Sequence, residues 1–265
     1  MLSSLHHRRG GRRKGAGRKP GKGKRPILHR TRPRHERRFP VHVTIHTAPK
    51  LVSLRRTTVY APLQDSIALA QRRWFRIVHF SVQANHVHLM VEATDKRTLS
   101  GGVKGLSVRI ARVYNRVQHR RGAVIGNRYH ARELTTARQV RTVLVYVMQN
   151  WRKAHPWIGG LDDLSSAAWF GGWDEETRVA MSGWAADRTR GSPWQCAAPL
   201  VAMPRDSRRG WAAARRARAA GCPLVPVVAP TTDLLTWMWR ARGGGELSLL
   251  DTPRIPEWDD FVPTR

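Results

Sequence analysis

Two alternating runs of apolar and polar residues stand side by side in this sequence and limit what the chain can fold into. Residues 75–83 (FRIVHFSVQ) and 86–93 (HVHLMVEA) both alternate, and only Ala84 and Asn85 separate them. Alternation puts the apolar side chains on one face of a strand, and a two-residue link is typical of a hairpin. The sequence therefore predicts an antiparallel β-hairpin.

The remaining patterns surround this hairpin with helices and further strands. Strands are expected at 41–46, before Pro49, and at Tyr129–Thr135. Apolar residues at three- and four-residue spacing predict helices at Thr57–Arg73, Leu99–Gln118 and Ala137–Ala154. The order β-α-β-β-α-β-α predicts an α+β fold: a ferredoxin-like βαββαβ sandwich with one antiparallel sheet, helices on one face and one additional helix.

The positive charge is confined to one part of the chain. The net charge is +30, and residues 1–155 carry 35 Lys and Arg against five acids, whereas residues 156–265 carry 13 of each. A basic surface composition spread over the whole chain would not give this asymmetry. Lys and Arg neutralise phosphates and release counterions, so the first part predicts a nucleic-acid partner.

Composition divides the chain into three regions. Residues 1–38 are rich in Arg, Lys, Gly and Pro and predict a basic disordered arm. Arg18 and Lys19 lie in a segment similar to an AT-hook, for which a generic basic tail is the alternative. Residues 39–155 form the predicted folded domain. Residues 156–265 hold nine of the eleven tryptophans and form an accessory region for packing or base stacking. Its helical candidates are 175–187, 207–220 and 231–242.

Cysteine usage and hydropathy favour the cytoplasm. Cys196 and Cys222 are too few for a disulfide framework or a four-thiolate zinc site. The sequence shows no run of 18 apolar residues and no signal peptide. We therefore expect a soluble, cytoplasmic, nucleoid-associated protein with no membrane partner.

His86 and His88 are the histidines best placed for a metal. In a strand, residues i and i+2 project from the same face, so the two imidazoles lie side by side. Imidazoles bind Mn²⁺, Zn²⁺ and related ions, and two of them leave positions for substrate oxygens. The alternative is a polar strand face whose histidines meet solvent.

Tyr146 and Asn150 are four residues apart on a predicted helix, so their side chains share a face. A tyrosine nucleophile needs its phenolate stabilised near a metal or a base, and an amide oxygen can act as a third, hard ligand. The alternative for Tyr146 is an aromatic side chain in the buried stripe of the helix.

Three segments of residues 39–155 resemble REP-associated tyrosine transposases and their insertion-sequence relatives. They are NHVHLMVE with its His-hydrophobe-His motif, GNRYHARE (Gly126–Glu133) and YVMQN (Tyr146–Asn150). The tyrosine follows the histidine pair in the family order. Ala84 and Trp151 stand where the family often has proline, which bears on loop and helix-end geometry.

The resemblance implies a mechanism and a partner. His86, His88 and Asn150 would hold Mg²⁺ or Mn²⁺, and Tyr146 would attack single-stranded DNA to form a 5′-phosphotyrosine. The substrate would carry a hairpin of a repeated palindrome, and the enzyme would act as a monomer or homodimer. Candidate DNA contacts outside the arm are Lys104, Arg109, Arg112, Arg116, Arg128 and Arg132, each of which has a solvated surface role as its alternative.

Three other functions are weighed against this one. A domesticated, non-catalytic hairpin-binding protein would be expected to have lost part of the motif, yet all four site residues are present. A replication or conjugation nickase usually carries a differently placed tyrosine and extra domains. An RNA-binding ferredoxin-like domain would show exposed aromatics where His86 and His88 stand.

Overall fold

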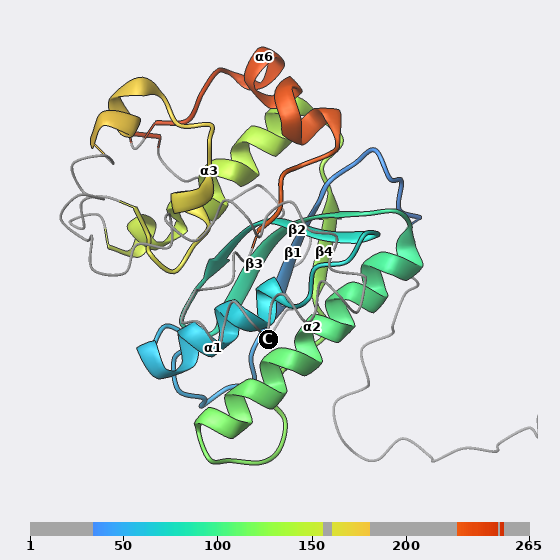
Figure 1. Cartoon of the computed structure of the whole chain (residues 1–265), viewed down its shortest axis with the longest axis vertical. Coiled ribbons are helices and arrows are strands. Elements are labelled where there is room, and N and C mark those ends of the chain that lie inside the picture. The colour runs from blue at the N-terminus through green and yellow to red at the C-terminus, as the bar shows by residue number, and fades with distance from the viewer. Residues whose placement is uncertain (1–33, 156–160, 181–226, 249, 252–265) are drawn as a thin grey trace, which may run out of the picture. The chain divides into compact units, whose positions relative to one another are not determined.

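The computed structural model describes residues 34–155, 161–180, 227–248 and 250–251 (Figure 1). Its strands are β1 (Val41–His46), β2 (Phe75–Val82), β3 (His86–Ala93) and β4 (His130–Glu133). Its helices are α1 (Thr57–Ala68), α2 (Lys96–Val117), α3 (Ala137–Ala154), the 3-10 turn η1 (Ala167–Trp169), the π-helix η2 (Leu234–Met238) and α6 (Trp239–Gly243). The element order predicted for residues 39–155 is confirmed.

The four strands form one antiparallel sheet in the order β2-β3-β1-β4. The hairpin of β2 and β3 has one irregularity, between Ile77 and His79, where the register shifts. In the centre of the sheet, Thr44 of β1 pairs with His88 of β3, and His46 pairs with His86. This register brings polar residues of β1 beside both histidines of the predicted motif.

The helices cover both faces of the sheet, so the expectation of helices on one face was wrong. Helices α1 and α2 share a core with the odd-numbered residues of β1, such as Val43. Helix α3 packs on the opposite face with Val78 and Met90. The reason is the residue pattern of the strands. Strand β3 has apolar residues on one face and the apolar Met90 on the other, so helices can pack on both faces.

Two helix boundaries differ from those predicted. Helix α2 begins three residues before Leu99 because Asp95 and Thr98 form a capping box, in which Asp95 Oδ1 accepts from the Thr98 amide at 2.8 Å. Helix α1 ends at Ala68 rather than Arg73, because the chain turns tightly between Arg72 and Phe75 to enter β2. Helix α3 has the predicted bounds.

The described C-terminal segments pack on the domain that precedes them. Residues 164–166 run along the edge of β2, where Ser166 donates its amide to the Phe80 carbonyl at 2.8 Å. Trp173 and Trp239 are buried in the core with α3, so these two tryptophans have a packing role. Residues 34–251, where described, belong to one compact unit, and the boundary near residue 155 stays a prediction.

An ion pair and a group of hydrogen bonds hold two of these segments on the domain. Arg55 forms a two-pronged ion pair with the buried carboxylate of Asp162, at 2.7 and 2.9 Å. Glu92 of β3 accepts hydrogen bonds from the amides of Thr231 and Thr232, just before the helical residues 233–243. The helix predicted at 231–242 is present, and so is the start of the helix predicted at 175–187. Residues 181–187 and the helix predicted at 207–220 lie outside the described part of the chain.

The arm and the membrane prediction are only partly covered by the structure. Residues 34–38, assigned to the arm, include His35, which is buried between the Ala93 carbonyl (2.9 Å) and Glu133 (2.5 Å). Arg18 and Lys19 lie outside the described residues. Within the described ranges, every helix is too short or too polar to cross a bilayer.

Candidate catalytic site

The two histidines of β3 face each other on the side of the sheet that α3 covers. The Nε2 atoms of His86 and His88 lie 2.9 Å apart. His88 is only 4% exposed, whereas His86 is half-buried. One imidazole pair thus sits at the edge of the core, with one member open to solvent.

Helix α3 brings Tyr146 to this pair. The Tyr146 and His88 ring centroids are 4.9 Å apart, with an angle of 71° between the ring planes. Tyr146 and Asn150 are both half-buried and lie on one face of the helix. The structure therefore brings Tyr146 and Asn150 together with the imidazole pair, although some 60 residues separate the two motifs in sequence.

Neighbouring side chains occupy the other nitrogen of each imidazole. His86 Nδ1 lies 2.7 Å from Asn85 Oδ1, which can only accept, so this Nδ1 carries the proton and Nε2 presents its lone pair. His88 Nδ1 lies 3.2 Å from Thr44 Oγ1 and 3.3 Å from His42 Nε2. A threonine hydroxyl both donates and accepts, so Thr44 can satisfy either tautomer of His88.

Burial keeps the site histidines neutral. It lowers the pKa of His86 to about 4, helped by the nearby His46, and that of His42 also to about 4, helped by His86. The pKa of His88 is well below its ordinary value because of burial first and the neighbouring imidazoles second. Near neutral pH these imidazoles are thus in the form that binds metals.

Burial has the opposite effect on the nucleophile candidate. It raises the pKa of Tyr146 above 10, and the hydrogen bond with Asn150 offsets this only in part. The phenolate is therefore disfavoured at this position unless a positive charge lies beside it.

Two imidazole nitrogens and one amide oxygen form a mixed donor set that suits a divalent metal ion. Among the described residues no three His, Cys, Asp or Glu side chains gather to bind a metal, so a site here would need the Asn150 amide beside two imidazoles. For bonds of about 2.1 Å, adjacent ligands of an octahedral ion lie roughly 3.0 Å apart, close to the 2.9 Å between the two Nε2 atoms. Octahedral geometry is typical of Mg²⁺ and Mn²⁺.

The predicted DNA contacts fall on different sides of the sheet. Arg132 of β4 pairs with His42 in the antiparallel register and is exposed on the histidine face. Arg128 is exposed just before β4. The remaining predicted contacts lie on α2, against the opposite face: Lys104, Arg109, Arg112 and Arg116. The structure therefore brings Arg132, but not the α2 residues, to the candidate site.

Two site residues were not singled out from the sequence. His42 and Thr44 alternate on one face of β1, which the sequence shows, but their contact with His88 depends on the register of β1 against β3. Strand pairing across more than 40 residues leaves no local signal, so the sequence alone does not reveal this contact.

Comparison with known proteins finds similarity to transposases in this part of the chain. Residues 41–150 match the family model of IS200-like transposases. A REP-associated tyrosine transposase solved with a REP hairpin is 16% identical with a TM-score of 0.43, covering 53% of this chain and 82% of that one. A putative transposase from Deinococcus radiodurans R1 is 20% identical with a TM-score of 0.32, covering 51% and 97%. No curated protein matches the sequence.

Proposed function

We propose that this protein nicks and rejoins single-stranded DNA with Tyr146 as its nucleophile, because residues 41–150 match the family model of IS200-like transposases. The observation that carries the proposal is the position of Tyr146 beside the imidazole pair. The ring centroids of Tyr146 and His88 are 4.9 Å apart, and the Nε2 atoms of His88 and His86 are 2.9 Å apart. A nucleophile and a pair of neutral imidazoles meet where a scissile phosphate can reach both.

In the proposed step, the phenolic oxygen of Tyr146 attacks a DNA phosphorus in line with the departing 3′ oxygen. The new bond is a 5′-phosphotyrosine, the bond to the 3′ oxygen breaks, and the released strand takes up a proton as a free 3′-hydroxyl. Rejoining is the reverse, because the ester bond is conserved in the covalent link. Since burial disfavours the free phenolate, we infer that Tyr146 loses its proton as the attack proceeds.

The proposed cofactor is Mg²⁺ or Mn²⁺, held by His86, His88 and Asn150. Bound there, it would stabilise negative charge on the phosphate oxygens. Thr44 and His42 orient His88 through its Nδ1, so that Nε2 is turned toward His86.

The proposed substrate is single-stranded DNA that carries a hairpin, in line with the sequence resemblance. The strand order β2-β3-β1-β4 is that of a ferredoxin-like sheet, and α3 is the additional helix, which would carry the nucleophile. Arg132, exposed on the histidine face, and basic residues of the arm would add contacts to phosphates. A cytoplasmic location and a monomeric or homodimeric state remain part of this proposal.

A covalent-adduct assay tests the proposal. The protein is incubated with Mn²⁺ and end-labelled hairpin oligonucleotides from the sequences that flank its own gene, and then denatured. We expect a labelled protein band that Tyr146→Phe and His88→Ala abolish. Tyr114→Phe is the matched control, because Tyr114 is buried on the other face of the sheet, and it should keep the band.

The result that would overturn the proposal is a protein that binds the hairpins tightly and forms no adduct with Mn²⁺ or Mg²⁺. Such a protein would be a non-catalytic DNA-binding relative. An adduct that persists in Tyr146→Phe would move the nucleophile to another residue.

A further inference from the structure

The exposed face of helix α2 is basic. The residues of α2 that are open to solvent fall on one side of the helix, opposite the buried Val103 and Leu106. This face, here named the α2 basic face, consists of Arg97, Gly101, Lys104, Gly105, Val108, Arg112 and Arg116. Helix α2 contains no Asp or Glu, so the charges on this face are all positive.

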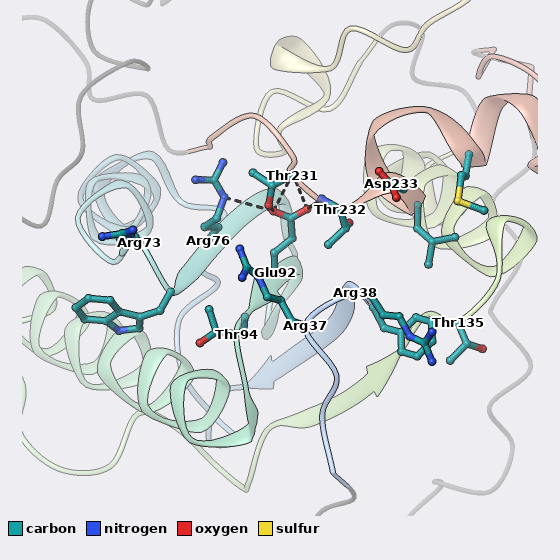
Figure 2. Close-up of a pocket in the computed structure, with 15 residues that line it drawn as sticks. Arg37, Arg38, Arg73, Arg76, Glu92, Thr94, Thr135, Thr231, Thr232 and Asp233 are labelled. Atoms are coloured by element: carbon teal, nitrogen blue, oxygen red, sulfur yellow. Dashed lines mark hydrogen bonds and ion pairs between the residues drawn. The ribbon is translucent and has the colours of Figure 1, made fainter.

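The basic side chains of the α2 basic face are available to a partner. Within the ranges that the structure describes, these arginines and the lysine form no ion pair. Arginines elsewhere on the fold already have carboxylate partners. Arg76, for example, pairs with Glu92, as a dashed line in Figure 2 shows. The α2 basic face therefore presents positive charge that an anionic partner can neutralise.

Further positive charge lies at the border of this face. Burial lowers the pKa of the half-buried Arg109 guanidinium, and the neighbouring charges of Arg72 and Arg112 lower it further. Like charges held this close repel each other. A polyanion bound along α2 would relieve the repulsion between these guanidinium groups.

The α2 basic face is turned away from Tyr146. Helix α2 packs on one face of the sheet, and α3, which carries Tyr146, packs on the other (Figure 1). The sheet and the body of α2, which is about 10 Å across, separate the basic face from the histidines. The partner of this face is therefore not the stretch of strand that lies at Tyr146.

The shape of the α2 basic face matches a rigid, double-stranded partner. Arg97 and Arg116 are about 28 Å apart along the helix axis, which equals about eight base pairs of DNA. A Cβ at Gly101 or Gly105 would meet nothing within 4 Å, so a sugar–phosphate backbone can approach the helix closely between the basic residues. A straight row of charges on a helix suits a duplex, which is itself stiff over this length.

The composition of the face argues against two other partners. Unpaired bases bind by stacking on aromatic side chains, and the α2 basic face has none. A membrane surface needs a broad apolar face beside the charges, whereas Val108, which is 42% exposed, is the one branched apolar side chain on this face. Double-stranded DNA, contacted through its phosphates, fits these features best.

We propose that the α2 basic face binds a second DNA, a continuous duplex that is separate from the strand at Tyr146. The basic side chains contact the phosphates of this duplex and read no base, so binding is independent of sequence. One protein molecule therefore holds the duplex and its single-stranded substrate at the same time. That the duplex is DNA and not RNA rests on the proposed function.

The test measures binding without cleavage, in Tyr146→Phe protein with a metal chelator present. The protein is loaded with one equivalent of a fluorescent hairpin, and a blunt DNA duplex of about 16 base pairs, twice the span of the α2 charges, is titrated in with a second dye. We expect the duplex to bind while the hairpin stays bound.

The variant that tests the surface adds Lys104→Ala and Arg112→Ala to this protein. The slope of log K against log salt for the duplex should become shallower by about 1.8, which is about 0.9 for each lost phosphate contact. Duplex binding should weaken by at least about tenfold near 0.1 M salt, and hairpin affinity should stay unchanged.

A matched variant separates the α2 basic face from the net charge of the protein. Arg138→Ala with Arg242→Ala removes the same charge from exposed positions on α3 and α6, and this double variant should bind the duplex like its parent. Alanine is the strongest helix former, so neither pair of substitutions should disturb its helix. The basic arm is present in all of these proteins, so its contribution to duplex binding cancels in the comparison.

A duplex that displaces the hairpin would overturn the inference, because the two DNAs would then share one surface. An α2 variant with the duplex affinity and salt slope of its parent would overturn it as well, as would an equal loss in the Arg138 and Arg242 control. The duplex can also be titrated without the hairpin, and the assay needs neither metal nor strand cleavage. A failed nucleophile assignment and a failed assignment of the α2 basic face are thus distinguishable.

Discussion

Protonation of His79 should limit the stability of this fold in acid. His79 lies on β2, is 8% exposed and packs its ring edge-on against Phe170, with centroids 5.3 Å apart. Its polar neighbour is Ser166, whose Oγ is 3.3 Å from His79 Nδ1. Burial lowers the pKa of His79 to about 3.

The sign and size of the effect follow from linkage. In the unfolded chain the pKa of histidine is about 6.5, so between pH 6.5 and pH 3 the unfolded state binds the proton that the folded state excludes. The contribution is therefore fully present above pH 6.5 and is lost as pH falls. The loss due to His79 reaches about 2 kcal/mol at pH 5 and about 4–5 kcal/mol near pH 3.

The variant His79→Phe removes the titrating group and keeps a planar ring against Phe170. The measurement is urea unfolding, followed by tryptophan fluorescence, at pH 7 and pH 5. Between pH 7 and pH 5, we expect the free energy of unfolding of the variant to fall by about 2 kcal/mol less than that of wild type. His42 and His86, whose pKa values are lowered to about 4, act in the same direction, so the variant should stay partly acid-sensitive.

The exposed residue His119 supplies the control, because His119→Asn should keep the wild-type difference between the two pH values. If His79→Phe and wild type lose the same stability between pH 7 and pH 5, then His79 takes up its proton in the folded state without penalty. The reasoning from burial would then be refuted.

Three further changes test the packing and the site. Asp162→Ala leaves the guanidinium of Arg55 without its buried carboxylate and should lower the free energy of unfolding by about 3–5 kcal/mol in urea titrations. Gly102→Ala would place a Cβ 2.2 Å from the ring of Phe75 and should cost about 1–3 kcal/mol, read as a lower melting temperature. Thr44→Val removes a hydroxyl beside the site imidazoles and should weaken Mn²⁺ binding about 10-fold in calorimetry.

Two of these changes have matched controls in the chain. Gly101→Ala meets nothing within 4 Å, so it should leave the melting temperature unchanged or raise it. Thr142→Val on α3 removes a hydroxyl that bonds only within its own helix and should leave Mn²⁺ affinity as in wild type. Equal effects of Gly101→Ala and Gly102→Ala, or of the two threonine changes, would show that the contacts named here do not determine the outcome.

Local sequence determined the elements and half of the site. Alternation is a property of neighbouring residues, and it predicted both hairpin strands and placed His86 beside His88. Helical periodicity is likewise local, and it predicted α3 with its bounds and set Tyr146 and Asn150 on one helix face. These predictions held because the backbone alone fixes where side chains at such spacings point.

Only the tertiary structure decided which elements meet. Helix α3 covers the histidine face of the sheet, so Tyr146 lies against His88. Helix α2 covers the opposite face, so its basic residues lie away from the histidines. The register of β1 against β3 brings Thr44 to His88, and the hydrogen bond from the Thr231 amide to Glu92 joins segments nearly 140 residues apart in the chain. Such contacts depend on the packing of the whole chain, and no short segment of sequence encodes them.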